Sequence, residues 1–475
     1  MPGGWTFRLP TGAAQQAQWN PDEFSLVGAD GLPWPTSVAM DGDRLVLNRV
    51  ARDPASVQLP LLVPDFGRIL VQSCPLPEGG AYRLGLELAR GEVGKARTEF
   101  AELQLKGLRP SSALTQAMND ACTRLTHAVF THDEQAELDA VRSALWCGEL
   151  LTEEFGRRAA TARKGRSDKP IRLSCVFDDR FFDLEDPAAL RKLFDAVTVP
   201  IDWPSLEFDS GERDWQSLER RVDWCLDRGL AVTVGPILDL YALPGWLKGL
   251  GDSEAVGMLM IDLVETVVSR LQDRVTSWEV VSGANSEAAF ADDDRGAMLL
   301  VMKALDAVRV QDPQARLSLT IDRPWADYLS TGLKRTSPID FLDRLLRVDA
   351  PISSLNLEIA VGVDDRPSRR RSTLDFTRLL DRYGDLGPSL SVRFFHPHET
   401  SETPTLLGQS GGDRQADWLE SHFLAAVSKT FVERVEWGRL HDLPNQARPG
   451  CGLFAENREP KRALRRLRAI RKACF

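Results

Sequence analysis

Short apolar runs with strand-like composition fill the first hundred residues. Turn signals such as Asp41-Gly42 separate them. The runs are DRLVLNRV (43–50), SVQLPLLV (56–63), GRILVQS (67–73) and YRLGLELA (82–89). Strands at this spacing are typical of a small sandwich, so we predict a β-sandwich over residues 1–108. Its tryptophans Trp5, Trp19 and Trp34 either stack on sugar rings, as in a carbohydrate-binding module, or fill the core and edges of a structural cap.

The spacing of apolar positions becomes helical from Ser111 onward. Two stripes follow each other, the first through Leu114, Met118, Cys122, Leu125 and Val129, the second through Leu138, Val141, Leu145 and Phe155. Two successive amphipathic stripes predict a helical hairpin that braces the β domain. A polar, turn-rich stretch at 160–170 predicts a linker, so the hairpin and linker span residues 109–165.

After Pro170, apolar strands alternate with amphipathic helices eight times. The predicted strands are 171–178, 196–203, 231–238, 275–282, 316–322, 353–361, 389–396 and 432–439. The clearest helical patterns are 215–229, 298–310, 372–385, 416–430 and 459–473. This alternation requires a parallel sheet covered by helices, and eight units over residues 166–475 match a (β/α)8 TIM barrel. A doubly wound sheet is the competing α/β fold, but no G-x-G-x-x-G opens a helix after any strand.

Composition narrows the class of protein. The chain has 475 residues, with 43% hydrophobic and 27% charged residues, as in soluble multidomain proteins. A net charge of −10 argues against nucleic acid or an anionic membrane as the main partner. The amino-terminal segment lacks the pattern of a signal peptide, and no apolar run reaches the length of a membrane span. The seven cysteines are scattered and never in C-x-x-C spacing, so we expect a cytoplasmic protein with reduced thiols.

Acidic and aromatic residues gather at the carboxyl ends of the predicted strands, where barrels carry their chemistry. The acids with possible catalytic roles are Asp239, Glu287, Asp322 and Glu358. The predicted substrate-binding residues are Asp202, Trp203, Tyr241, Trp246, Asn285, Arg393, His396 and Trp437. Aromatic faces stack on sugar rings and carboxylates bind hydroxyls, so an oligo- or polysaccharide is the expected partner. We assign no cofactor and no metal to this site.

Four segments resemble glycoside hydrolase family 10, the endo-1,4-β-xylanase family. They are 197–235, LPGWL (243–247), WEVVSGAN (278–285) and 452–470, and the resemblance covers about residues 170–475. It implies a retaining enzyme with an acid/base glutamate on strand 4 and a nucleophilic glutamate on strand 7. In this sequence those positions fall on Ser282-Gly283 and on Arg393 or Phe394. The ordinary xylanase mechanism is therefore not supported.

Three hypotheses remain, and the first is a glycoside hydrolase with relocated carboxylates. Glu287, Glu358 or Glu399 would act together with an aspartate, Asp239 or Asp322. Glu358 is the best candidate, because a buried carboxyl group on an otherwise apolar strand would have a raised pKa. The alternative for Glu358 is a structural ion pair with Arg323 or Arg393.

The second hypothesis is a catalytically inactive pseudoenzyme that binds glycans or serves as a scaffold. The third is a metal-assisted hydrolase that uses His396, His398 and Glu399 near Asp322. The basic run 366–371 is predicted to be a solvated loop over the barrel mouth, and it would favour an acidic sugar if it faced inward.

Overall fold

The computed structural model describes residues 4–10, 23–164, 170–184, 187–250, 252–286, 294–331, 336–361, 369–398, 414–443 and 448–474. Its first eight strands form two four-stranded sheets, in the orders β4-β5-β1-β8 and β3-β2-β6-β7. The bounds are β1 Trp5–Arg8, β2 Ser25–Val27, β3 Pro33–Trp34, β4 Ser37–Asp41, β5 Arg44–Asn48, β6 Ser56–Val63, β7 Gly67–Gln72 and β8 Ala81–Arg83. Side chains of both sheets, including Phe7 and Val57, share one hydrophobic core.

The tryptophans of this sheet domain have structural contacts. Trp5 is fully buried, and its indole Nε1 donates a hydrogen bond of 2.8 Å to the carbonyl of Leu76. Trp34 is half-buried, and its Nε1 donates to the carboxylate of Asp30 at 2.9 Å. Trp5 therefore belongs to the core, and the hypothesis that it stacks on a sugar is wrong. Trp19 lies outside the described residues.

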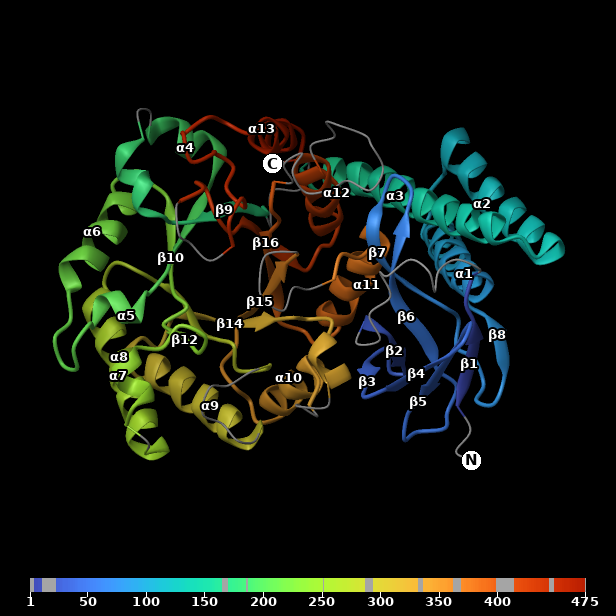
Figure 1. Ribbon diagram of the computed structural model, residues 1–475. Coiled ribbons are helices and arrows are strands. Elements are labelled where there is room, and N and C mark those ends of the chain that lie inside the picture. Colours follow the sequence, from blue (N-terminus) through green and yellow to red (C-terminus); the bar gives the residue numbers. More distant parts are fainter. Residues whose placement is uncertain are drawn as a thin grey trace.

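Three long helices follow the sheets: α1 Leu84–Leu105, α2 Ser112–Thr131 and α3 Glu134–Lys164. The predicted strand 82–89 is wrong beyond Arg83, because Leu84 begins the 22-residue helix α1. Its buried positions continue with helical spacing through Leu88 and Ala96. Figure 1 shows α3 running from the sheet domain to the barrel, where it packs against α12 and α13, whose bounds follow.

Eight parallel strands form the closed barrel that the sequence predicts. They are β9 Arg172–Val176, β10 Ala196–Val199, β11 Ala231–Val234, β13 Ser277–Ser282, β14 Arg316–Asp322, β15 Ser354–Ala360, β16 Ser389–Phe395 and β17 Val432–Trp437. Pairing of β11 with β13 closes the sheet β11-β10-β9-β17-β16-β15-β14-β13 into a ring. A short additional strand, β12 Leu238–Asp239, pairs with the carboxyl end of β13.

Helices surround this ring of strands (Figure 1). They are α4 Pro187–Leu193, α5 Trp203–Leu206, α6 Trp215–Leu226, α7 Gly245–Lys248, α8 Ser253–Leu271, α9 Asp294–Gln311, α10 Pro338–Arg347, α11 Thr373–Gly384, α12 Arg414–Val427 and α13 Arg462–Cys474. Two 3₁₀ helices, Asp179–Asp183 and Asp327–Thr331, lie in the loops after β9 and β14. Apolar side chains of strands and helices form one continuous barrel core.

The basic run after β15 joins the barrel to the sheet domain. Arg369 donates to the carbonyl of Glu23 at 2.8 Å, and Arg370 donates to the carbonyl of Phe66 at 2.9 Å. The amide of Leu70 on β7 donates to the carbonyl of Arg370 at 2.8 Å. For these arginines the predicted solvated loop is wrong, because their donors satisfy carbonyl groups of the neighbouring domain. Residues 366–368 lie outside the described residues.

A half-buried lysine makes a second connection. Lys95 on α1 contacts Glu92 at 2.8 Å and Asp375 on α11 at 2.9 Å. Burial alone would lower the pKa of Lys95, but these two carboxylates raise it above its ordinary value. Lys95 therefore stays charged between the helices of the sheet domain and the barrel.

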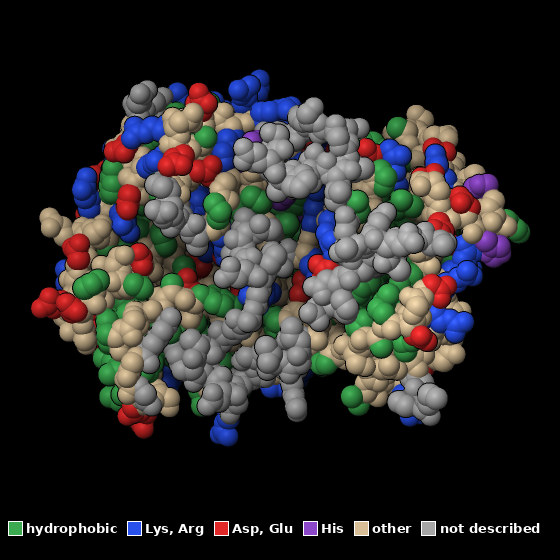
Figure 2. All heavy atoms as spheres, in the orientation of Figure 1, with side chains coloured by type: hydrophobic (Ala, Val, Ile, Leu, Met, Phe, Trp, Pro, Cys, Tyr) green, Lys and Arg blue, Asp and Glu red, His purple; other side chains and the backbone are tan. Residues whose placement is uncertain are grey.

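The surface carries both signs of charge. On the face shown in Figure 2, basic and acidic side chains are interspersed among the described residues. Within the described segments, no helix is long and apolar enough to cross a membrane.

Candidate active site at the barrel mouth

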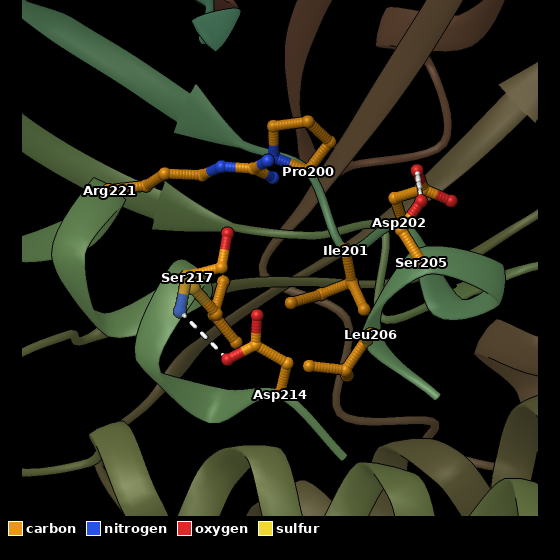
Figure 3. A pocket seen from close by; sticks show the side chains of 9 residues that line it. Pro200, Ile201, Asp202, Ser205, Leu206, Asp214, Ser217 and Arg221 are labelled. Atoms are coloured by element: carbon orange, nitrogen blue, oxygen red, sulfur yellow. Dashed lines mark hydrogen bonds between the residues drawn. The ribbon is translucent and has the colours of Figure 1, made fainter. Parts of the chain in front are cut away.

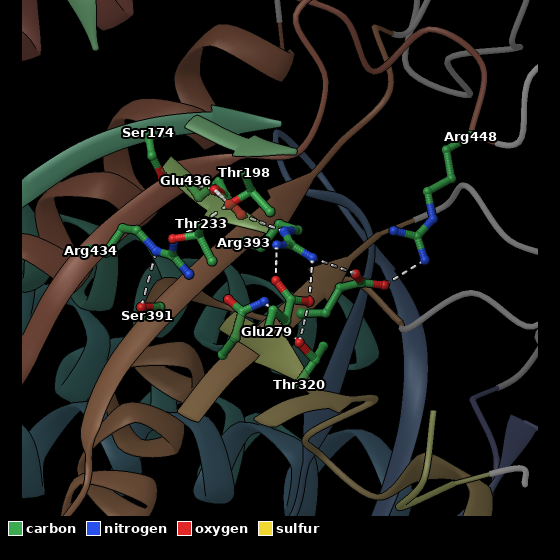
Figure 4. A network of polar contacts seen from close by, with 12 residues as sticks. Ser174, Thr198, Thr233, Glu279, Thr320, Ser391, Arg393, Arg434, Glu436 and Arg448 are labelled. Atoms are coloured by element: carbon green, nitrogen blue, oxygen red, sulfur yellow. Dashed lines mark hydrogen bonds and ion pairs between the residues drawn. The ribbon is translucent and has the colours of Figure 1, made fainter. Parts of the chain in front are cut away.

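Charged side chains occupy the barrel interior, where bulky branched residues are usual. Arg393 on β16 lies between Glu279 on β13 and Glu436 on β17 (Figure 4). Its Nη2 donates to Glu279 at 2.5 Å, and its Nε donates to Glu436 at 2.5 Å. Thr198 and Thr320 donate hydroxyl hydrogen bonds to the same two carboxylates, at 2.6 Å and 2.5 Å. Arg393 and the two glutamates form a buried network.

Electrostatics keep Glu436 ionised. Burial would raise the pKa of Glu436, but Arg393 and Arg434 outweigh burial and lower it to about 2. Arg434 lies within the barrel and donates to Thr233 at 2.9 Å and to Ser391 at 3.2 Å (Figure 4). Because both carboxylates that flank Arg393 are committed to it, they serve the structure of the barrel interior.

The two positions where the family resemblance places glutamates cannot hold them in this geometry. Arg393 occupies the strand-7 position and is needed as a counter-ion. Gly283 follows β13 with a φ of 84°, in the left-handed region that favours glycine, and a Cβ there would lie 2.9 Å from the ring of Tyr241. A glutamate at position 283 would therefore strain the backbone and collide with Tyr241.

Glu358 projects from β15 beside this network. Its Oε1 accepts from Nη2 of Arg448 at 2.5 Å, and its Oε2 lies 4.0 Å from Nη1 of Arg393. Burial alone would raise the pKa of Glu358, but the two guanidinium groups lower it below its ordinary value. The prediction of a raised pKa is wrong, and the ion pair with Arg393 is confirmed. Sequence reasoning missed Arg448, which gives no local signal because it follows strand 8, 90 residues away.

Asp322 at the end of β14 is held by three neighbours. Its Oδ2 accepts from the Tyr241 hydroxyl at 2.5 Å and from the Ser286 hydroxyl. Asn285 makes two hydrogen bonds to the backbone of Asp322. Nδ2 of Asn285 donates to the Asp322 carbonyl at 2.8 Å, and Oδ1 of Asn285 accepts from the Asp322 amide at 3.2 Å. Burial raises the pKa of Asp322. Asp322 is only 6% exposed and Asn285 only 3%, so both support the mouth from within the protein.

Asp239 on β12 is the more accessible of the two aspartates. It is half-buried, and its Oδ1 accepts from the amide of Tyr241 at 3.1 Å. Burial, together with the negative charge of Glu358, raises the pKa of Asp239 to about 6. The exposed ring of Tyr241 lies beside it. The mouth thus holds two carboxyl groups, Asp239 and Glu358, whose pKa values are displaced in opposite directions.

Two of the predicted sugar-binding tryptophans are in the core. Trp437 is fully buried, and its Nε1 donates to the carbonyl of Cys451 at 2.9 Å. Trp203 is 2% exposed, and its Nε1 donates to the carboxylate of Glu207 at 2.9 Å. Neither ring has a free face, so stacking of Trp203 or Trp437 on a sugar is wrong. Trp246 is half-buried and packs edge-on against Trp203, with ring centroids 6.2 Å apart.

Arg393 is bound to Glu279 and Glu436, and Nδ1 of His396 contacts the carbonyl of Pro397 at 2.8 Å, so the prediction that they bind substrate is wrong. His396 is 2% exposed, and its ring lies 4.8 Å from that of Trp418. Burial lowers the pKa of His396 to about 3, so it is a neutral core residue.

Among the described residues, no three His, Cys, Asp or Glu side chains come together as a metal site. Glu287 and Glu399 lie outside the described residues, and Asp202 is exposed on the strand-2 loop.

Comparisons with known proteins agree with the fold. No protein-family profile matches the chain. Endo-1,4-beta-xylanase 3 of Hypocrea jecorina is 25% identical over 152 residues, which cover 29% of this chain and 44% of that protein. Endo-1,4-beta-xylanase B of Thermotoga neapolitana is 22% identical over 251 residues, which cover 50% of this chain and 69% of that protein. The chain thus spans less than half the length of the first of these relatives.

Solved structures of xylanases share the fold of this barrel. Xylanase 10B from Thermotoga maritima superposes with a TM-score of 0.50 and 17% identity, covering 68% of this chain and 98% of the xylanase. Xylanase 10B from Thermotoga petrophila, solved with xylobiose, gives a TM-score of 0.50 and 16% identity, covering 68% of this chain and 97% of that one. The described residues between 170 and 474 therefore form a divergent barrel with the fold of glycoside hydrolase family 10.

Proposed function

We propose that this protein binds an oligosaccharide in the barrel mouth and hydrolyses its glycosidic bonds with relocated carboxyl groups. The observation that carries the proposal is a pair of carboxyl groups at the mouth: Asp239, which accepts from the Tyr241 amide, and Glu358, which accepts from Arg448. Burial and the negative charge of Glu358 raise the pKa of Asp239, whereas Arg448 outweighs burial and lowers the pKa of Glu358. Pairs of titratable groups whose pKa values are displaced in opposite directions are typical of acid and base roles. The xylanase relatives and the shared barrel fold support a glycan as the substrate class.

In the proposed reaction, Asp239 is the proton donor. Its proton moves to the glycosidic oxygen as the bond between this oxygen and the anomeric carbon breaks. Glu358 remains ionised and stabilises the positive charge that develops on the sugar ring. Water then attacks the anomeric carbon and loses its proton to a carboxylate of the site. The exposed ring of Tyr241 offers a face for a sugar unit.

The rate is expected to depend on pH with a limit near pH 6. Asp239 must be protonated to act, and its pKa is raised to about 6, so kcat/KM should fall as the pH rises through this value. Glu358 must be ionised, and its lowered pKa moves the acid limb below the ordinary glutamate range. A profile of kcat/KM between pH 3 and 9 measures both limbs. A rate that increases steadily above pH 7 would contradict the assignment of Asp239.

A second candidate is a glycan-binding protein without turnover. It is favoured by Arg393, which fills the strand-7 position, and by Gly283, which leaves the strand-4 position without a side chain. Here Glu358 stays paired with Arg448, and Asp239 and Tyr241 hydrogen-bond to sugar hydroxyls. The fold and the exposed mouth residues would serve recognition alone.

One panel experiment separates the two candidates. The purified chain is incubated with xylo-, gluco-, manno- and uronate-containing oligosaccharides, with products followed by chromatography and binding by calorimetry. Hydrolysis requires both binding and product release for at least one oligosaccharide. Saturable binding with no product after long incubation supports the binding protein instead. If no oligosaccharide binds or reacts, both the hydrolase and the glycan-binding proposal are contradicted.

A further inference from the structure

A half-buried guanidinium group beside the mouth has no partner among the described residues. It belongs to Arg439, which lies two residues after β17, in the loop at the mouth end of the barrel. Its Nε is covered and unpaired. Its terminal nitrogens are open to solvent, and no hydrogen bond or ion pair joins them to the part of the chain that the structure describes. Nη1 and Nη2 of Arg439 are therefore available to a ligand.

This lack of contacts distinguishes Arg439 from other arginines whose Nε is covered and unpaired. Arg221, which lies beside Pro200 in a surface depression between the loop after β10 and α6 (Figure 3), still pairs through Nη2 with Asp179 at 2.9 Å. Three more such arginines have contacts through their terminal nitrogens: Arg49 with Asp53 at 2.6 Å, Arg228 with the carbonyl of Trp224 at 2.9 Å, and Arg371 with Asp327 at 2.5 Å. A covered Nε alone is therefore uninformative, whereas an arginine without any of these contacts is a candidate binding group.

The carboxylates closest in influence to Arg439 are engaged with other residues. Asp178 accepts from the amide of His441 at 3.1 Å, and its Oδ1 lies 2.9 Å from Nδ1 of the same histidine. Asp442 pairs with Lys461 at 2.5 Å. Neither carboxylate is in direct contact with Arg439, so its charge has no counter-ion among them.

Burial and a neighbouring guanidinium group make this charge unfavourable. Burial contributes most to lowering the pKa of Arg439, and the positive charge of Arg448 lowers it further. Cys451, Asp178 and Asp442 act in the opposite direction, but the pKa remains below its ordinary value. An anionic group of a ligand would supply the missing counter-charge, so this part of the mouth favours an anion over a neutral group.

Arg439 lies close to the proposed catalytic groups. The residue before it, Gly438, lies against the ring of Phe395 at the end of β16, and a Cβ added to Gly438 would be 2.3 Å from this ring. The guanidinium carbon of Arg448 lies over the same ring, 4.1 Å from its centroid, and Nη2 of Arg448 donates to Glu358. A ligand that extends from Glu358 along Arg448 therefore reaches Arg439.

We propose that Arg439 binds the carboxylate of a uronic acid unit in an oligosaccharide that occupies the mouth. This inference names the substrate class and rests on the proposed function, because it requires a glycan at the mouth. Nη1 and Nη2 donate to the two carboxylate oxygens, a forked arrangement that suits a planar guanidinium group. The charges of Asp178 and Asp442 disfavour a phosphate group, which is more negative than a carboxylate. A sulfate ester carries a single charge, so the experiment includes one.

Calorimetry with matched ligands tests the proposal. The first ligand is a xylo-oligosaccharide that bears a glucuronic acid unit, the second is the same oligosaccharide with its carboxyl group reduced to a primary alcohol, and the third bears a sulfate ester instead. The full chain is compared with Arg439→Gln, which removes the charge, and with Arg439→Lys, which keeps the charge without the fork. Arg468→Gln is the control variant, because Arg468 is exposed on α13, outside the ring of strands.

The unaltered protein should bind the uronate ligand at least about tenfold more tightly than its reduced form, as expected for a charge-assisted contact. Arg439→Gln should bind the two with similar affinity, Arg439→Lys should show an intermediate preference, and Arg468→Gln should keep the full preference. Equal affinities in the unaltered protein, or the full preference in Arg439→Gln, would overturn the proposal. Tighter binding of the sulfate ester than of the uronate would overturn it as well.

Product release from the reduced oligosaccharide tests hydrolysis separately, because this ligand has no carboxylate for Arg439. Product release together with equal binding would overturn the uronate site alone, and a uronate preference without product would contradict hydrolysis alone. Binding of none of the three ligands would contradict both. Arg439→Gln removes no contact with the described residues, so it should unfold at the same denaturant concentration as the unaltered protein. A clear loss of stability would assign Arg439 a structural role and overturn the proposal.

Discussion

Replacing Arg393 with methionine should lower the free energy of unfolding by about 3–5 kcal/mol. Methionine has a similar length but no charge, so the variant leaves Glu279 and Glu436 buried without their counter-ion. Both side chains are fully buried, and each accepts a short hydrogen bond from Arg393. Chemical denaturation followed by tryptophan fluorescence measures the loss.

A surface pair supplies the control for this variant. Arg316→Met breaks the ion pair with Glu433, whose partners are 55% and 37% exposed, and should cost at most about 1 kcal/mol. If Arg393→Met fails to fold, Arg393→Lys keeps the charge without the forked geometry and should give an intermediate loss. Equal stabilities of Arg393→Met and Arg316→Met would contradict the structural role of the network.

The network also determines how stability changes with pH. The pKa of Glu436 is lowered to about 2 in the folded protein. Its stabilising contribution is therefore fully present above the ordinary glutamate pKa and is lost as the pH falls from that value toward 2. The Arg393→Met variant should lose less stability over this pH range, because Glu436 no longer has the counter-ion that contributes most to lowering its pKa.

Replacing Asp239 with asparagine should lower kcat/KM about 10²–10⁴-fold, the usual contribution of a general acid. Asparagine keeps the shape and the hydrogen bond from the Tyr241 amide but has no proton to give. Binding affinity should change little, because the mouth is otherwise intact. The limb of the pH profile near pH 6 should disappear together with the rate.

The exposed Asp227, the C-cap of α6, gives a matched control, because Asp227→Asn makes the same chemical change at the end of the barrel opposite to the mouth. Its kcat/KM should equal that of the unaltered protein. If Asp239→Asn retains the full rate and the same pH limit, the proton comes from another group. Asp322 would then be the next candidate, because burial raises its pKa as well.

The barrel could be predicted from the sequence because its strands and helices differ in hydrophobic period. The helix α1 could not, since Leu84, Leu86 and Leu88 alternate as they would in a half-buried strand. Only the sheet domain packed beside them shows that the segment is helical. A short alternating run is thus ambiguous until its tertiary contacts are known.

The candidate site could be predicted in part. The rule that barrel chemistry lies at strand ends found Asp239, Asp322 and Glu358. It could not find the direction of the Glu358 pKa shift, which depends on Arg448 from a distant loop. The rule also could not show that Trp437 is buried and Tyr241 exposed. A shift of one position along a strand end decides whether a ring faces the core or the mouth.

The carboxylate of Glu358 gives the most direct test of the proposed function. Product release and binding are measured for the unaltered protein and for Glu358→Gln with the oligosaccharide that reacts best in the panel. Glu358→Gln should bind this oligosaccharide with similar affinity and release product at least about 100-fold more slowly. Equal rates for both proteins, or the absence of any product from the unaltered protein, would contradict hydrolysis by the relocated carboxyl groups.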